Sequence, residues 1–308
     1  MHFLQRLHGS DGRPLPQLRR RTVAPSPPAA PHVNYRHAFH AGNFADVVKH
    51  LALVALLAHL KKKDKPFRVI DTHAGRGLYD LAGDEAARTG EAAEGIARLR
   101  ALGPADGFPP TLKTYLDLVH GVGEGRYPGS PLIAARLLRP QDRLIAIEKH
   151  VAECAALAAV LAPYRHAKTE EADGYARLAA LLPPPERRGL VLIDPPYEAP
   201  DEFARVGAAL AAAFRRFATG IYLVWFPVKS NSEADRFCGE VLAAGAVKAL
   251  RIDAAIDAKT GDKERLARAG LIVVNPPFGF ADEMAAVFSS VAKPLAARTD
   301  ISWLAGAP

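Results

Sequence analysis

The sequence has few cysteines, and this scarcity narrows the classes of protein that it can encode. Cys154 and Cys238 are the only two among 308 residues, and neither has a second candidate ligand nearby. Neither a disulfide framework nor a zinc or iron–sulfur cluster is indicated. No apolar run approaches the length of a membrane span, and the first residues lack the continuous apolar centre of a secretory signal. We therefore expect a cytoplasmic protein without a metal site.

A large surplus of positive charge is also lacking once the N-terminus is set aside. The net charge is +7, but residues 1–30 hold five arginines and one acid and supply +4 of it. Bulk charge is therefore weak evidence for an anionic partner. Two local basic clusters, HLKKKDKPFR (59–68) and FRRFATG (214–220), are better indicators, although lysines at a helix end are often ordinary caps.

A tail and a long helix open the chain. Residues 13–33 mix prolines, arginines and small residues with no period, which predicts a disordered basic tail over residues 1–33. The next stretch has Asn43 as an N-cap, Asp46 in the first helical turn, a dense apolar face, and lysines just before Pro66. This pattern predicts one long, buried helix.

Eight short apolar runs follow, separated by alanine-rich helical stretches. Runs that are apolar throughout are typical of parallel strands covered on both faces, so we predict an α/β fold with a mostly parallel sheet of seven strands. Such a sheet binds ligands beyond the carboxyl ends of its strands. The runs are FRVID (67–71), RLIAIE (143–148), AKTEEAD (167–173), GLVLID (189–194), GIYLVWFP (220–227), VKALRIDAAI (247–256), GLIVVN (270–275) and ISWLAG (301–306).

The connection between the first two runs is unusually long. About seventy residues separate them, far more than a crossover between parallel strands needs. Two stretches within it have a helical pattern. We therefore predict a small helical insertion at about residues 80–130, above the binding edge of the sheet.

Three successive strand ends carry residues suited to a cofactor that contains adenosine. Asp71 opens a glycine-rich turn, DTHAGRG, where the backbone can pass close to a ligand. Glu148, at the end of the second run, can accept hydrogen bonds from both hydroxyls of a ribose. Asp173 and Gly174, after the third run, can contact the amino group of an adenine. Each is an ordinary loop residue alone, and only their order along the sheet predicts the cofactor.

The fourth run ends in Asp194-Pro195-Pro196-Tyr197. The exocyclic amine of a purine is a poor nucleophile, so its methylation needs acceptors that stabilise a positively charged transition state. The Asp194 carboxylate and the Pro195 carbonyl are such acceptors, held stiffly because proline fixes φ, and Tyr197 can stack on the base. The alternative is a stiff turn without chemistry. An acid and an aromatic residue around the proline pair favour the catalytic interpretation.

A second stretch, VNPPF (274–278), competes for the same role because an asparagine oxygen is also an acceptor. The order of the runs argues against it. With Asp194 after the fourth strand, the remaining runs complete a seven-stranded sheet, whereas placing the catalytic loop at Asn275 leaves one run to finish it. We therefore interpret VNPPF as structural.

Eight blocks, spread over about nine-tenths of the chain, carry a family resemblance. They are NYRHAFHAGNFADVVKH (34–50), DKPFRVIDTHAGRGLYDL (64–81), RTGEAAEGIARL (88–99), YPGSPLIAARLLRPQD (127–142), EADGY (171–175), RRGLVLIDPPYE (187–198), RRFATGIYLVWFPV (215–228) and GLIVVNPPF (270–278). In these blocks the chain resembles the bacterial 23S rRNA adenine-N6 methyltransferases of the RlmJ family. The resemblance implies a Rossmann-like class I methyltransferase domain over residues 34–308 with an inserted helical subdomain, and S-adenosyl-L-methionine as cofactor. It further implies methylation of N6 of one adenosine in 23S rRNA, the family's adenine-2030 position.

The same resemblance implies roles for single residues. Asp194 is implied as the catalytic acceptor and as a cofactor contact, and Tyr35 as a residue that engages the RNA. His37, Lys49 and Tyr197 are further candidates for contacts with the substrate. The other implied cofactor contacts are His50, His73, Ser130, Glu148, Asp173 and Gly174. We expect a monomer whose partner is 23S rRNA, either free or in an assembly intermediate.

Two other functions stay open at this point. A DNA N6-adenine methyltransferase would share the Asp-Pro-Pro-Tyr loop but usually adds a target-recognition domain, for which only about fifty residues are free. A non-catalytic RNA-binding protein would bind the cofactor without turnover. The residues before Asn34 are either a tail that adds electrostatic affinity for RNA or the product of a wrongly chosen start codon, and their lack of any period favours the second.

Overall fold

The computed structural model describes residues 40–83, 90–102, 107–257 and 266–307. Contacts between segments divide the chain into two units, Met1–Asn34 and Tyr35–Pro308, and only the second contains described residues. The predicted tail therefore lies outside the described residues, and so do Tyr35 and His37.

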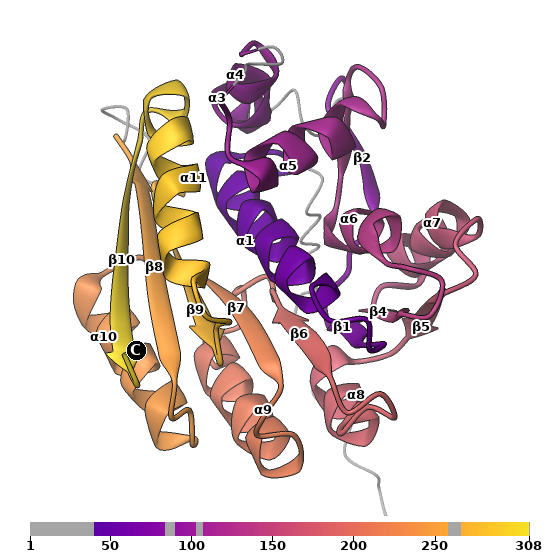
Figure 1. Ribbon diagram of the computed structural model, residues 1–308, viewed down its shortest axis with the longest axis vertical. Helices are drawn as coiled ribbons and strands as arrows, with labels where there is room; N and C mark the ends of the chain where they lie inside the picture. Colours follow the sequence, from indigo (N-terminus) through magenta and orange to yellow (C-terminus); the bar gives the residue numbers. More distant parts are fainter. Residues whose placement is uncertain (1–39, 84–89, 103–106, 258–265, 308) are drawn as a thin grey trace, which may run out of the picture. The chain divides into compact units, whose positions relative to one another are not determined.

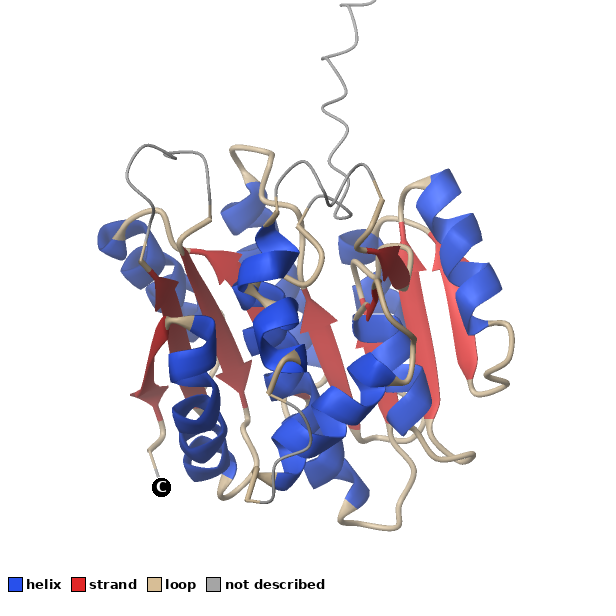
Figure 2. Ribbon diagram, turned by 90° about the horizontal axis from the view of Figure 1, so that it is seen from above, coloured by secondary structure: helices blue, strands red, loops and turns tan. Residues whose placement is uncertain are grey.

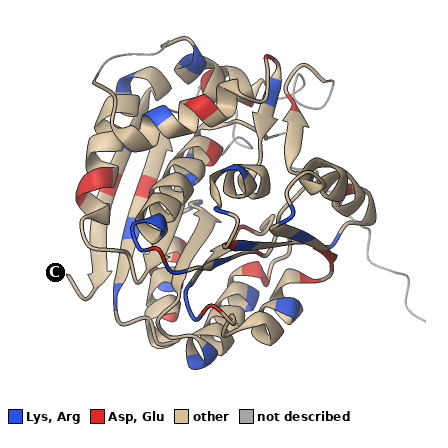
Figure 3. Cartoon of the chain, turned by 45° about the vertical axis from the view of Figure 1, so that its right-hand side comes forward, with Lys and Arg blue, Asp and Glu red and all other residues tan. Residues whose placement is uncertain are grey.

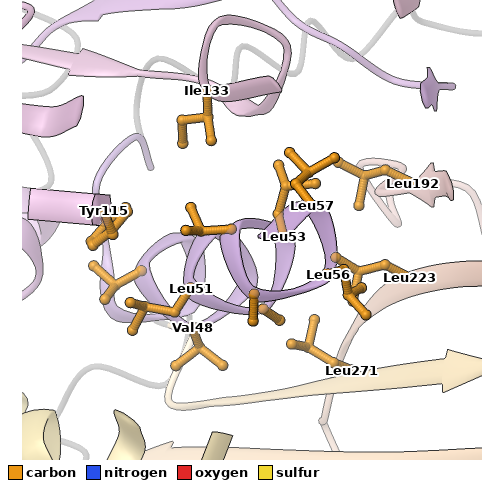
Figure 4. Close-up of a cluster of buried hydrophobic side chains, with 14 of the residues drawn as sticks. Val48, Leu51, Leu53, Leu56, Leu57, Tyr115, Ile133, Leu192, Leu223 and Leu271 are labelled. Carbon is orange, nitrogen blue, oxygen red and sulfur yellow. The ribbon is translucent and has the colours of Figure 1, made fainter. Parts of the chain in front are cut away.

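The predicted long helix is present as α1, Phe44–Lys61, and it forms the centre of one core (Figures 1 and 4). The Asn43 side chain caps it by accepting a hydrogen bond from the Asp46 backbone N–H at 2.9 Å. Figure 4 shows leucines of α1 pointing toward the sheet on one side and toward other helices on the other. Because α1 is covered on most sides, even its polar residues Lys49 and His50 are buried.

The sheet has eight strands in the order β10-β8-β9-β7-β6-β1-β4-β5. The strands from β5 to β7 in this order are parallel, whereas β9 is antiparallel to β7 and to β8, and β10 is antiparallel to β8. Their bounds are β1 Arg68–Asp71, β4 Arg143–Glu148, β5 Ala167–Glu171, β6 Gly189–Ile193, β7 Ile221–Pro227, β8 Ala249–Ile256, β9 Arg268–Val274 and β10 Ala297–Ala305.

The mostly parallel α/β fold is confirmed, but the predicted number of strands is wrong by one. All eight apolar runs form strands, and the additional one is β10, which pairs along most of its length with β8 at the edge of the sheet. The chain returns to this edge through α11, Phe280–Leu295, so the last run finds a free strand edge to pair with.

Helices cover both faces of the sheet, which explains why the central strands β6 and β7 are buried at almost every position (Figure 2). In β6, Leu190 and Leu192 enter the core formed with α1, whereas Val191 and Ile193 enter the opposite core. The first core also includes α6 Ser130–Leu137, α7 Val151–Leu161 and α11, and the second includes α8 Gly174–Leu181, α9 Glu202–Arg216 and α10 Asn231–Ala243.

The long connection between β1 and β4 combines short helices with a small two-stranded sheet. Besides α6, its described elements are β2 Leu78–Asp80, α3 Glu91–Glu94, α4 Ile96–Arg100, α5 Pro110–His120 and β3 Arg126–Pro128, with β2 and β3 antiparallel. The Ile96 N–H donates to the Gly42 carbonyl at 2.8 Å. A Cβ on Gly95 would lie 2.1 Å from that same oxygen, so this close approach to the start of α1 requires glycine.

Three further features of the described residues concern membrane spans, thiols and metal sites. None of the helices described is both long and apolar enough to cross a membrane. Cys154 and Cys238 are buried free thiols. No group of three or more His, Cys, Asp and Glu side chains within the described part could hold a metal ion.

Candidate active site at the carboxyl edge of the sheet

Asp194 follows β6 at the carboxyl edge of the parallel strands, where it pairs with a buried lysine. Lys49 Nζ on α1 lies 2.5 Å from Asp194 Oδ2 and 2.7 Å from Asp46 Oδ1. The side chains of Lys49 and Asp46 are 4% and 3% exposed, and that of Asp194 is 14% exposed. One ammonium group therefore holds two carboxylates, and only the Asp194 carboxylate keeps access to solvent.

The charge state of this triad follows from its contacts. Burial alone would lower the pKa of Lys49, but the charges of Asp194 and Asp46 outweigh burial and raise its pKa above the ordinary value. Lys49 is thus a permanent cation that both carboxylates stabilise. Asp46 is fixed in turn by a hydrogen bond from the Gly42 N–H to its Oδ2 at 2.9 Å. The position of Asp194 is therefore set through Lys49 and Asp46 by the first turns of α1.

Asp71, the last residue of β1, interacts electrostatically with Asp194 and Lys49 of this triad. Its Oδ2 accepts a hydrogen bond from Ser130 Oγ at 2.6 Å, at the start of α6, and the described residues give its buried Oδ1 no partner. Burial raises the pKa of Asp71 to about 7, the Ser130 hydrogen bond lowers it, and the charge of Asp194 raises it further. The charge of Lys49 and the His73 backbone N–H also lower this pKa, and Oδ1 keeps lone pairs that can accept from a ligand.

Glu148 links the glycine-rich turn to the end of β4. Its Oε2 accepts from the Gly75 N–H at 2.9 Å and its Oε1 accepts from the His150 N–H at 2.7 Å. Gly75 has φ +61°, and a Cβ there would lie 2.2 Å from the Tyr79 hydroxyl oxygen. Each carboxylate oxygen keeps a further lone pair, so Glu148 can also accept from the hydroxyls of a ribose.

Asp173 and Gly174 bring the loop after β5 against the loop after β1. The Asp173 side chain caps α8 by accepting from the backbone N–H groups of Tyr175 and Ala176. A Cβ on Gly174 would lie 2.0 Å from the Thr72 carbonyl oxygen, so only glycine fits. Thr72 also binds the Leu192 carbonyl through its N–H and its hydroxyl. Backbone contacts therefore join the ends of β1, β5 and β6.

His73 is held as a neutral ring between these loops. Its Nδ1 lies 2.8 Å from Thr72 Oγ1, and its ring meets that of Tyr175 edge-on with centroids 4.8 Å apart. Burial lowers the pKa of His73 to about 4, and the positive charge of Arg205 also lowers it while Asp173 opposes the change. Arg205 itself pairs with Asp173 at 3.4 Å, so one cation ties the loop after β5 to α9.

His50 lies one residue beyond Lys49 on α1 and faces the insertion. Its Nδ1 and the Tyr127 hydroxyl are 2.7 Å apart, and the Tyr127 and Tyr115 hydroxyls are 2.9 Å apart. These side chains are fully buried or nearly so. The insertion therefore contributes a chain of polar groups that ends next to the Lys49 triad.

Tyr197 is the last residue of the Asp-Pro-Pro-Tyr loop, and its side chain is largely buried. Its φ of 53° is left-handed, its hydroxyl donates to the Trp225 carbonyl at 2.9 Å, and its ring packs on Phe203 with centroids 4.7 Å apart. The residue is only 9% exposed. A base would therefore reach only the exposed part of this ring.

The competing VNPPF loop lies at the opposite edge. Because β9 is antiparallel to β7, the end of β9 meets the start of β7. The Asn275 amide donates to the Ala218 carbonyl at 2.8 Å and to the Gly220 carbonyl at 2.7 Å, just before β7. Strand direction thus separates the two loops, and the amide of Asn275 stabilises a turn.

Comparison with known proteins identifies the family. A family model described as ribosomal RNA large subunit methyltransferase D, RlmJ, matches residues 64–305. The Escherichia coli (strain K12) protein named ribosomal RNA large subunit methyltransferase J is 43% identical over 256 residues, covering 82% of this chain and 90% of the relative. The Haemophilus influenzae protein of the same name is 37% identical over 276 residues, covering 88% of this chain and 97% of the relative. The chain belongs to the RlmJ family.

A solved structure agrees with this placement. A crystal structure of a protein from Legionella pneumophila has a TM-score of 0.78 and 34% identity, and it covers 85% of this chain and 98% of that one. The chain is thus an rRNA large subunit methyltransferase by family, with S-adenosyl-L-methionine as cofactor. The carboxyl edge fits that cofactor, because it offers Asp71 Oδ1, which has no hydrogen-bond partner within the described part of the chain, the Glu148 carboxylate and close backbone approaches at Gly75 and Gly174.

Sequence reasoning missed two residues of this edge. The sequence pattern identifies Asp46 only as an acid in the first helical turn, yet it is the second carboxylate of the triad. Its spacing of three from Lys49 on one helix was an available signal, because residues at i and i+3 are neighbours on a helix surface. Arg205 on α9 had no comparable signal, since its contact with Asp173 depends on how α8 and α9 pack.

Proposed function

We propose that this protein transfers a methyl group from S-adenosyl-L-methionine to N6 of one adenosine in 23S rRNA, with Asp194 as the acceptor that holds the target amine. The main support is the position of Asp194 at the carboxyl edge, fixed by Lys49 and still accessible to solvent. A carboxylate held by a neighbouring cation keeps its place as positive charge develops on the amine nitrogen.

In this proposal, different residues of the loop bind the target amine and the base. Asp194 and the Pro195 carbonyl accept hydrogen bonds from the two N–H groups of the amine, and the exposed part of Tyr197 contacts the base. The cofactor supplies an electrophilic methyl group on sulfur. The amine needs no prior deprotonation and loses its proton after attack, so Asp194 orients the nucleophile more than it acts as a strong base.

Cofactor contacts are proposed for the residues that line the same edge. His73, Glu148, Asp173 and Gly174 belong to the loops after β1, β4 and β5. Ser130 acts through its hydrogen bond to Asp71, and His50 through its place beside Lys49. Asp194 borders both ligands. Tyr35 and His37, outside the described residues, remain proposed RNA contacts, whereas the buried Lys49 is proposed to act on the substrate through Asp194.

The substrate is proposed to be free 23S rRNA or an assembly intermediate in the cytoplasm, bound by a monomer at the family's adenine-2030 position. The target base has to be unpaired or extruded for its amine to reach Asp194, which lies within a partly buried edge.

The test is methyl transfer from labelled cofactor to protein-free 23S rRNA, to intact ribosomal subunits and to DNA. We expect label in RNA, recovered as N6-methyladenosine after digestion to nucleosides. Label that prefers DNA, or that is found on another base or atom, would overturn the proposal. Cofactor binding without transfer to any nucleic acid would instead support a non-catalytic RNA-binding protein.

A further inference from the structure

A cluster of cations lies at the edge of the sheet opposite Asp194. We call it the basic rim. It comes from the end of α1 and the segment after it, from the start of β4 and the segment before it, and from the segment before β6, which meet where parallel strands begin. Lys62, Lys63, Lys65 and Arg143 are exposed, and the other members are half-buried. The rim consists of Lys61, Lys62, Lys63, Lys65, Arg139, Arg143 and Arg188.

Hydrogen bonds show that the three segments form one surface. Arg139 donates to the carbonyls of Lys63 and Lys65, at 3.2 and 3.1 Å. Arg188 donates to the carbonyls of Lys65 and Leu60, at 2.6 and 2.9 Å. The guanidinium groups of Arg139 and Arg188 also lie 5.7 and 6.0 Å from the centre of the buried Phe67 ring. Figure 3 shows blue segments where the long central helix ends and the chain turns toward the strands.

The positive charge of this rim is only partly balanced. Lys61, Arg143 and Arg188 donate to neutral backbone carbonyls. Among the described residues, ion pairs and hydrogen bonds link the rim to Asp64 and to Asp142, which both contact Arg139. Burial lowers the pKa of Lys61 and of Arg188, and the positive charge of Arg139 lowers both further. These like charges repel one another, and a bound polyanion would relieve the repulsion.

The rim is far from the site of methyl transfer. Lys62, the C-cap of α1, lies thirteen positions after Lys49, which holds Asp194, or ~20 Å at 1.5 Å per residue. A ligand that fills the carboxyl edge does not reach the rim. The cofactor and the target base therefore leave these cations without a function.

We propose that the basic rim binds the phosphate backbone of a second part of the 23S rRNA, beyond the segment that carries the target adenosine. Exposed lysines around guanidinium groups suit phosphates and carry no base specificity. The inference rests on the proposed function, because it takes rRNA as the substrate. It predicts that an RNA long enough to pass from the carboxyl edge to the opposite edge binds more tightly than a minimal one.

The test compares two RNAs and two triple variants of the full-length protein. One RNA is a minimal hairpin that carries the target adenosine, and the other adds the helices that flank it in 23S rRNA. Lys62→Gln/Lys63→Gln/Lys65→Gln removes three exposed rim charges. The matched control, Arg236→Gln/Lys293→Gln/Arg298→Gln, removes three exposed charges from α10, α11 and β10.

We expect the rim variant to raise KM for the long RNA by about tenfold and to flatten the slope of log KM against log salt by about two to three, with kcat unchanged. The control variant should keep the wild-type slope. On the hairpin all three proteins should have the same KM. Equal salt slopes for the rim and control variants on the long RNA would overturn the inference. Failure of the proposed function itself is distinguishable, because the wild-type protein would then methylate neither RNA.

Discussion

Two loops that share a Pro-Pro pair lie at opposite edges of one sheet and have different roles. In the Asp194 loop the acidic side chain is held by a cation and stays accessible to solvent. In the Asn275 loop the amide is bonded to two carbonyls of its own neighbourhood. The Pro-Pro pair therefore stiffens the chain after the strand in both loops. The direction of the strand determines at which edge of the sheet the preceding residue lies, and so which role it can have.

The two edges also differ in how they hold charge. At the carboxyl edge, charged groups are buried and paired, as in the triad of Asp46, Lys49 and Asp194. At the opposite edge, cations are more exposed and several are held by neutral carbonyls. Buried and paired charges set the geometry of a reaction, whereas exposed and unbalanced charges suit a long polyanion.

The largest effect on stability should come from removing the cation of the triad. Lys49→Met leaves the buried Asp46 and the partly buried Asp194 facing each other without a counter-ion. We expect the free energy of unfolding to fall by about 3–5 kcal/mol, because uncompensated buried charge is costly. Urea unfolding measures this change.

The double variant Asp46→Asn/Lys49→Met is the control for that experiment. It removes one of the two carboxylates that have lost their counter-ion, so it should recover part of the lost stability while methyl transfer stays impaired. A loss below about 1 kcal/mol for Lys49→Met alone would show that the triad is not held as described.

The next effect should fall on activity and should separate the two loops directly. Asp194→Ala should lower kcat for methyl transfer by about 10²–10³-fold, since it removes an acceptor aimed at developing positive charge. The fold should survive because Lys49 keeps Asp46 as its partner. Asn275→Ala should retain wild-type kcat. Equal losses in the two variants, measured with the same rRNA, would refute the assignment of the chemistry to Asp194.

The sequence could predict which residues follow the strands, but not the direction of every strand. The runs that end in Asp71, Glu148 and Asp194 belong to parallel strands, so their ends meet at one edge. The run that ends in Asn275 is just as apolar, yet it is antiparallel to β7. Apolar composition reports burial on both faces and carries no information about direction, so the distinction had to come from the order of the runs.

Contacts made through packing were likewise beyond the sequence. Lys49 was a candidate for the substrate site, but its role as the bridge between two carboxylates depends on α1 lying beside the end of β6. The strand count failed for a related reason, since whether the last run pairs depends on where α11 returns it. Local patterns predicted the elements, and the distances between elements decided the site.

Replacing Asn275 should lower the stability of the fold and not the rate of methyl transfer. Asn275→Ala loses two hydrogen bonds and places alanine at a φ of 54°. We expect the free energy of unfolding to fall by about 2 kcal/mol, of which about half reflects the left-handed backbone. Asn275→Gly loses the same hydrogen bonds without the backbone strain, so it should lose only about 1 kcal/mol in urea unfolding. Equal losses would assign the whole effect to the hydrogen bonds.

The last effect should be a change in how stability depends on pH, at the carboxyl edge alone. The pKa of His73 is lowered from 6.5 to about 4, so between these pH values the unfolded chain binds the extra proton, and His73 makes stability rise with pH. The pKa of Asp71 is raised from 3.8 to about 7, so there the folded chain binds the extra proton, and Asp71 makes stability fall as pH rises. Without cofactor, His73→Gln should therefore reduce the rise of unfolding free energy from pH 4 to 6.5, and Asp71→Asn should increase it. Changes of the same sign in both variants would contradict the environments described for these two groups.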